Sequence, residues 1–117
     1  MKTVSNKETS KANTLVCKTA EGLVFINLDD IICLKADRHF TQIFIVDREK
    51  SIKVMSNISS LIPELSQNAF IQCHRSYIIN TRHISHYRQK CKELVMKKNI
   101  TVPVSKSYEK KLLKIFL

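Results

Sequence analysis

After residue 13, hydrophobic and polar residues alternate with a period of two over most of the chain. Such alternation is typical of short β-strands with one buried face. This alternation, together with short runs rich in β-forming residues, predicts strands over residues 15–19, 23–28, 31–35, 40–46, 51–55, 70–74, 77–80, 83–87, 93–97 and 100–104. Gly22 lies between the first two strands, so we expect a β-hairpin whose turn uses the positive φ that glycine tolerates.

One segment in the middle of the chain follows the helical period instead. Its apolar residues, spaced i, i+3, i+4 and i+7 between Ser/Asn capping candidates and Asn68, are Ile58, Leu61, Ile62 and Leu65. Pro63 falls inside this segment. We therefore expect either a regular helix that begins near Ser60, with Pro63 in the tolerated first turn, or a helix kinked at the proline.

The last segment also follows the helical period. Its apolar residues, spaced i, i+4, i+7 and i+8, are Tyr108, Leu112, Ile115 and Phe116. They predict a short amphipathic helix capped by Ser105.

The order of these elements is strand-rich, one helix, strand-rich, final helix. Because no βαβ alternation occurs, we expect a mainly β fold of short antiparallel strands with one intervening helix and a short C-terminal helix. Residues 1–13 are polar and lack periodicity, which predicts a flexible tail. The remaining residues, 14–117, fit a single domain by length.

Charge is distributed unevenly along the chain. Its formal net charge is +10, but residues 14–73 carry six basic and seven acidic side chains. Residues 74–117 carry eleven basic and two acidic side chains, a net charge of +9. This asymmetry indicates a region that meets a polyanion, whereas solvated lysines on exposed hairpins are the simpler alternative.

Several function classes are disfavoured by composition. The single glycine excludes the glycine-rich phosphate loops, so we expect no nucleotide cofactor. The sequence contains neither paired carboxylates in a plausible cleft nor an activated Ser or Cys signature, so it does not indicate an enzyme. No apolar run approaches the ~20 residues of a membrane span, and the amino end lacks a signal sequence, which favours the cytoplasm.

The four cysteines, Cys17, Cys33, Cys73 and Cys91, are widely spaced and fit free thiols in a reducing compartment. A metal site is conceivable around His83 and His86, whose spacing suits a ligand pair. On a strand, however, residues three apart face opposite sides, so we expect no metal there.

Two separated motifs point to a known family. They are Phe70-Ile71-Gln72-Cys73-His74-Arg75-Ser76-Tyr77-Ile78-Ile79-Asn80 and Val102-Pro103-Val104-Ser105-Lys106 before the last helix. Together they resemble the LytTR family of bacterial DNA-binding domains, over about residues 14–117. The resemblance implies an elongated β body that places loops, instead of a recognition helix, into successive major grooves. Most members carry a receiver domain before this one, for which these 117 residues leave no room.

The resemblance also implies positions of DNA contact. The family's first contact loop matches Asp37-Arg38-His39, where His39 is favoured and Arg38 is its neighbour. The second contact matches Arg75. The third opens the final helix at Lys106, where members more often have arginine, so a phosphate contact is favoured over base readout.

The residues themselves agree with these positions. Arginine is the residue most often paired with guanine, and the alternative of a structural ion pair for Arg75 lacks a carboxylate between Glu64 and Glu93. Lys106 at a helix start is unfavourable until an anion binds there, although it could simply be solvated. Further phosphate contacts are expected from Arg82, Arg88, Lys90, Lys110 and Lys111.

We therefore expect sequence-specific binding of double-stranded DNA by a small bacterial transcription regulator. The alternative is an RNA or single-strand-binding module, which needs exposed aromatic rings. Most of the eight aromatic residues fall at core-like positions, such as Phe25, Phe44, Phe70 and Phe116. The resemblance implies paired direct repeats in the DNA and a second copy on one operator. For some short members it implies a membrane or signalling partner, which no residue here specifies.

Overall fold

The computed structural model describes residues 13–65 and 69–117. Their strands are β1 (Thr14–Thr19), β2 (Gly22–Asn27), β3 (Ile31–Asp37), β4 (Phe40–Ile45), β5 (Ile52–Val54), β6 (Phe70–His74), β7 (Tyr77–Asn80), β8 (Ile84–Arg88), β9 (Glu93–Met96) and β10 (Thr101–Pro103). The α-helices are α2 (Ile58–Leu65) and α3 (Lys106–Phe116), and 3₁₀ turns occupy Leu28–Asp30, Thr81–His83 and Lys97–Asn99. The predicted mainly β fold is confirmed. Apart from residue 13, the predicted tail of residues 1–13 lies outside the described residues.

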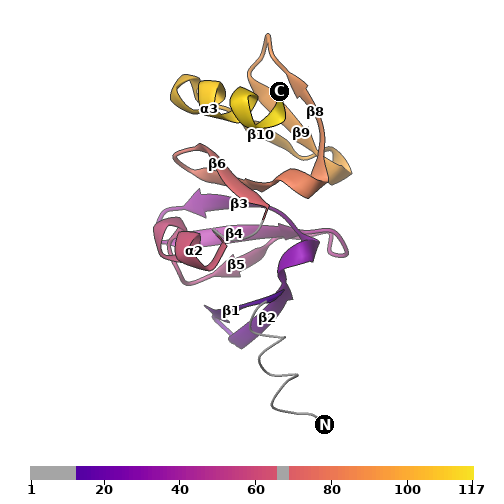
Figure 1. The fold of residues 1–117 in the computed structure, drawn as a ribbon. Coiled ribbons are helices and arrows are strands. Elements are labelled where there is room, and N and C mark those ends of the chain that lie inside the picture. The colour runs from indigo at the N-terminus through magenta and orange to yellow at the C-terminus, as the bar shows by residue number, and fades with distance from the viewer. Residues whose placement is uncertain (1–12, 66–68) are drawn as a thin grey trace.

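The strands form three antiparallel sheets that succeed one another along the molecule (Figure 1). β1 pairs with β2, the central sheet has the order β5-β4-β3-β7-β6, and the last has the order β10-β9-β8. The principal extents are 50 × 29 × 24 Å, so the molecule is elongated, as expected. The β1–β2 hairpin and α3 lie towards opposite ends of the long axis (Figure 1).

Two hydrophobic cores lie on the two faces of the central sheet. Leu34 of β3 and Ile78 of β7 pack into a core shared with the hairpin and α2. Their sequence neighbours, Cys33 and Ile79, pack into a second core shared with β9, β10 and α3. Because alternate side chains of a strand point to opposite faces, β3 and β7 serve both cores. Their apolar runs are therefore continuous, as expected for strands covered on both sides.

Helix α2 begins earlier than the regular helix expected from near Ser60. It starts at Ile58, so Pro63 lies beyond the first turn. The side chain of Asn57 accepts a hydrogen bond from the backbone N–H of Ser60 at 2.9 Å, which caps the helix. The buried residues of α2 are Ile58, Leu61 and Leu65.

Helix α3 starts directly after Ser105, as predicted, but the serine side chain makes no capping bond. Its hydroxyl lies 3.2 Å from the hydroxyl of Ser107 instead. The carbonyl oxygen of Ser105 accepts hydrogen bonds from the N–H groups of Tyr108 and Glu109, both at 3.0 Å. The N-cap side chain therefore leaves the first N–H groups of the helix uncapped, and Glu109 is the acidic residue of its first turn.

The N-terminal hairpin confirms one prediction and corrects another. Gly22 has φ of 137°, in the region that glycine tolerates. Phe25, however, is 69% exposed instead of buried, and it pairs across the hairpin with exposed Val16. A two-stranded sheet packs only one face on the core, and these two residues lie on the other face. Phe116, which the sequence also predicts at a core position, is 40% exposed, near the end of α3.

Candidate nucleic-acid interface

Three basic segments lie at one end of the central sheet. The turn Arg38-His39 joins β3 to β4, and the turn Arg75-Ser76 joins β6 to β7. The backbone N–H of Ala36, near the first turn, donates to the carbonyl of Ser76 in the second at 2.8 Å. The N–H of Ser105, at the entry to α3, donates to the carbonyl of Cys73 in β6 at 3.0 Å. Backbone hydrogen bonds thus hold the three segments next to one another.

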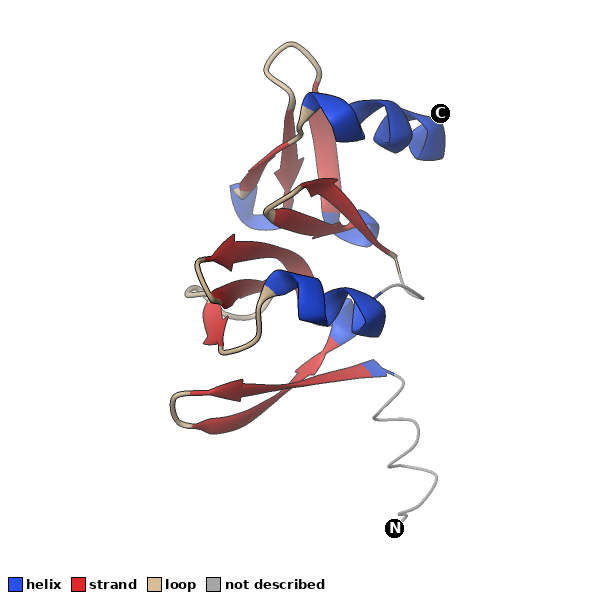
Figure 2. Cartoon of the chain, turned by 90° about the vertical axis from the view of Figure 1, so that its left-hand side faces the viewer, coloured by secondary structure: helices blue, strands red, loops and turns tan. Residues whose placement is uncertain are grey.

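These segments also share one long side of the molecule. Figure 2 shows the turns, in tan, along the left-hand side, with the β6–β7 turn between the β3–β4 turn and the start of α3. The central sheet and the α3 end are held together by the shared second core. The three segments therefore form a row on a rigid scaffold, which we call the turn row (Arg38, His39, Arg75 and Lys106).

The first turn holds Arg38 in an unusual conformation. Arg38 has φ of 59°, the left-handed region, which costs a non-glycine residue roughly 1–2 kcal/mol. Both Arg38 and His39 are exposed. The adjacent carboxylate of Asp37 accepts a hydrogen bond from Gln42 at 3.0 Å and lies 4.0 Å from the ammonium of Lys53. Arg38 itself forms no ion pair with any described carboxylate.

The second turn is braced from within while its arginine remains free. The Nδ1 of His74 accepts the backbone N–H of Ser76 at 3.1 Å, and the Gln72 amide donates to the Arg75 carbonyl at 3.4 Å. The rings of His74 and Tyr77 meet edge to face, with centroids 5.6 Å apart. Arg75 is exposed and pairs with no carboxylate of the described residues. The alternative of a structural ion pair for Arg75 is therefore not what this structure contains.

The third segment is the start of α3. Lys106 is its first residue and is exposed, and Lys110 lies four residues on, at the same helical face, and is also exposed. Uncapped N–H groups and the positive end of the helix dipole attract anions at this point. The arrangement therefore suits a phosphate group, which would neutralise both the helix end and Lys106.

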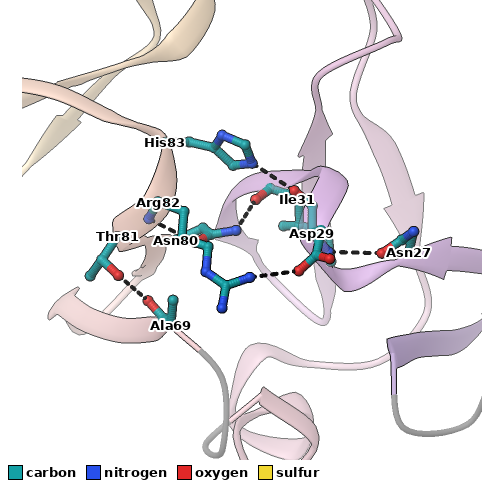
Figure 3. A network of polar contacts seen from close by, with 8 residues as sticks. All are labelled: Asn27, Asp29, Ile31, Ala69, Asn80, Thr81, Arg82 and His83. Carbon is teal, nitrogen blue, oxygen red and sulfur yellow. Dashed lines mark hydrogen bonds and ion pairs between the residues drawn. The ribbon is translucent and has the colours of Figure 1, made fainter. Parts of the chain in front are cut away.

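Arg82 does not join the turn row. Arg75 lies in the turn before β7, and Arg82 lies in the 3₁₀ turn after it. The two arginines are therefore at opposite ends of this strand. The guanidinium of Arg82 is 3.0 Å from the carboxylate of Asp29, while His83 Nε2 is 2.7 Å from the Asp29 carbonyl oxygen (Figure 3). Arg82 already has an anionic partner within the protein.

Lys35 is a further basic residue close to the turn row, and sequence reasoning missed it. It lies on β3, opposite Tyr77 of β7, with its ammonium 5.9 Å from the centre of the tyrosine ring. Its pairing with the strand that follows Arg75 brings it towards the turn row. Its own segment is an apolar run that ends in this lysine, so only the pairing of β3 with β7 reveals its place beside the Arg75 turn.

The three buried thiols are unreactive. Burial raises the pKa of Cys33 and of Cys73 to about 12 and that of Cys17 to about 11, so these thiols stay protonated. Cys91 is exposed. In the described part of the chain, no three His, Cys, Asp or Glu residues are grouped to hold a metal ion. Across residues 13–65 and 69–117, every helix is too short or too polar to cross a bilayer.

Known proteins match the chain over most of its length. The LytT sensory transduction protein of Bacillus cereus is 28% identical over 117 residues, covering 92% of this chain and 44% of its own length. The LytT protein of Bacillus subtilis strain 168 is 27% identical over 104 residues, covering 86% and 42%. The chain thus spans less than half the length of these curated relatives.

A solved structure shares the fold. The LytTr DNA-binding domain of a response regulator from Bacillus cereus superposes with a TM-score of 0.74 at 26% identity, covering 89% of this chain and 96% of that one. Residues 21–116 match the family described as the LytTr DNA-binding domain, which is a DNA-binding family and not an enzyme family. By fold, by sequence and by the extent of this match, the chain belongs to the LytTR family of DNA-binding domains.

Proposed function

We propose that this domain binds double-stranded DNA sequence-specifically, with the turn row entering the major groove. The observation that carries the proposal is the exposure of Arg75 without a carboxylate partner, between two further basic segments held to it by backbone hydrogen bonds. An arginine on a braced turn suits bidentate recognition of guanine. Family membership supports DNA binding and a role in transcription regulation.

Each residue of the turn row has a proposed role. Arg75 reads a guanine edge, and His39 contacts a base or a phosphate from the strained first turn, with Arg38 beside it. Lys106 and Lys110 bind phosphates at the start of α3. The position of Arg82 does not support the DNA contact expected for it, because Asp29 already neutralises its charge.

Phosphate contacts make binding depend on salt. If Lys106 and Lys110, together with Arg88, Lys90 and Lys111, neutralise about five phosphates, the binding constant should fall with salt at a log-log slope of about −0.9 per contact. Paired direct repeats occupied by two copies also belong to the proposal. Bacterial DNA lies in the cytoplasm, so the proposal also places this domain in the cytoplasm.

RNA or single-strand binding is the weaker candidate. Exposed Phe25 could stack on a base, but it lies on the N-terminal hairpin, towards the opposite end of the molecule from α3 (Figure 1). At the turn row, Tyr77 packs edge to face against His74, and the Phe40 ring lies 4.5 Å from the Lys53 ammonium. Neither ring is presented alone to a base.

Selection of bound fragments from random duplex DNA, followed by sequencing, tests the proposal. We expect a defined motif to emerge, and binding to that duplex to survive an excess of single-stranded RNA of the same composition. Enrichment of no motif, or displacement of the duplex by equimolar RNA, would show that the proposed function is wrong.

A further inference from the structure

One acidic residue stands out in the cationic second half of the chain. Glu109 lies on α3 between Lys106 and Lys110, and residues 74–117 contain only one other acidic residue, Glu93. The side chain of Glu109 is 14% exposed, whereas Lys106 and Lys110 are exposed. A carboxylate placed on the inner side of a DNA-facing helix calls for a physical reason.

Both oxygens of this carboxylate are engaged. Oε2 accepts the hydroxyl of Tyr87, on β8, and Oε1 accepts the ammonium of Lys92, each at 2.6 Å. Hydrogen bonds from Lys92 and Tyr87 hold the pKa of Glu109 below its usual range, and burial together with Glu109 raises the pKa of Tyr87. Such charge-assisted bonds are among the stronger ones that proteins form.

Lys92 also fixes the entry to the helix through its backbone. It lies in the turn between β8 and β9 with φ of 54°, and its carbonyl oxygen accepts the N–H of Val104 at 2.8 Å. Val104 is the residue before the N-cap of α3. One residue of the β8–β9 turn therefore holds both the carboxylate of the helix and the strand segment that leads into it.

Besides these polar contacts, α3 packs against β6. Leu112 is its only fully buried residue, and Ile115 is 54% exposed. Because only one of the eleven residues of α3 is fully buried, the polar contacts of Glu109 add to this packing in fixing the direction of the first turns.

We infer that Glu109, held by Tyr87 and Lys92, is a positioning residue that aims Lys106 and Lys110 at DNA. This inference rests on the proposed function. If only net charge mattered, removing an acid near bound phosphate should strengthen binding to a polyanion. If Glu109 is a positioning residue, removing it should instead weaken binding to the specific site.

Three variants separate these effects. Tyr87→Phe removes one hydroxyl and no charge, and Glu109→Gln removes the charge but keeps the shape. Glu93→Gln is the matched control, because it removes an acid of the same region that forms no ion pair with any described residue. Each variant is titrated with the selected duplex and with a scrambled duplex at one salt concentration.

For Tyr87→Phe and Glu109→Gln we expect specific affinity to fall about tenfold, a size set by one charge-assisted hydrogen bond. We expect scrambled-duplex affinity to stay constant for Tyr87→Phe and to stay constant or rise for Glu109→Gln. Glu93→Gln should bind both duplexes equally well or more tightly. If Tyr87→Phe bound like the wild type, or Glu109→Gln behaved like Glu93→Gln, the inference would be wrong.

Amide hydrogen exchange in the DNA-free protein supplies a second readout. We expect the hydrogen-bonded amides of residues 108–110 to exchange faster in Tyr87→Phe, while the central sheet exchanges at the wild-type rate. Unchanged exchange in α3 overturns the inference whether or not DNA binds. Failure of the wild type to prefer any duplex, with faster exchange in the variant, would instead count against the proposed function alone.

Discussion

The two ends of the β3–β7 strand pair carry similar polar residues, but these residues are paired within the protein at one end and exposed at the other. At the Asn80 end, the buried Asn80 amide donates to the Ile31 carbonyl at 2.9 Å, and Arg82 pairs with Asp29 (Figure 3). At the Tyr77 end, Arg38 and Arg75 are exposed and have no carboxylate partner among the described residues. One end is closed by its own polar groups, and the other is open.

The difference shows that nearby carboxylates decide whether a basic side chain forms an internal ion pair or stays available for an external anion. An arginine beside an aspartate contributes to the junction between sheets, whereas an arginine on an internally braced turn is available to an external anion. Each end can therefore be altered separately, and the following experiments do so from the largest expected effect to the smallest.

Removing the buried amide should have the largest effect on stability. Asn80→Ala leaves the Ile31 carbonyl without its donor and deletes the Asn80 cap of the backbone N–H of Arg82. We expect the free energy of unfolding to fall by about 2–4 kcal/mol, measured by urea denaturation. Asn27→Ala is the control, because exposed Asn27 caps an equivalent turn at Asp29, and should cost about 1 kcal/mol. Equal losses in the two variants would contradict the importance of burial.

At the open end, Arg75→Ala should affect DNA binding and leave stability unchanged. We expect the free energy of unfolding to stay unchanged and binding of the selected duplex to weaken by about 1–3 kcal/mol, with relaxed preference at one base pair. Arg75→Lys keeps the charge but loses the planar fork, so it should retain scrambled-duplex affinity and lose base preference. A gel-shift titration of both proteins checks this. Wild-type affinity and preference in Arg75→Ala would remove Arg75 from the interface.

An added acid should make the open end resemble the closed one. The Gln72 amide donates to the Arg75 carbonyl, so Gln72→Glu both removes this donor and places a carboxylate beside the Arg75 turn. We expect DNA binding to weaken by about 1 kcal/mol, the scale of an exposed ion pair. Added to Arg75→Ala, the same substitution should have a smaller effect than in the wild type. Full additivity in this double-mutant cycle would show that the new carboxylate does not act through Arg75.

Arg82→Ala should have the smallest effect. Its ion pair with Asp29 is formed by side chains that are 65% and 60% exposed, so we expect a loss of less than about 1 kcal/mol in unfolding free energy. DNA affinity and its salt slope should match those of the wild type. A loss of affinity as large as that of Arg75→Ala would mean that DNA also reaches the Asn80 end.

Local sequence patterns were sufficient to predict the helices and strands, but they predicted the residues of the candidate DNA interface less completely. Alternation and short apolar runs predicted the strands, and Gly22 and Ser105 marked a turn and a helix start that the structure contains. The same patterns placed Phe25 in the core, because a strand segment does not reveal how many of its faces will be covered. They also grouped Arg82 with the other basic residues, because Asp29 is more than fifty residues away in sequence.

By itself, the sequence determined the strand-rich architecture, the cationic second half and the motifs around Arg75 and Lys106, since periodicity, charge and short motifs are properties of neighbouring residues. Only the tertiary structure decided which of the cations are free. That choice depends on contacts between distant segments: β3 with β7, Asp29 with Arg82, and Glu109 with Tyr87 and Lys92. Strand pairing and packing bring these groups within hydrogen-bonding distance, and no local pattern encodes that proximity.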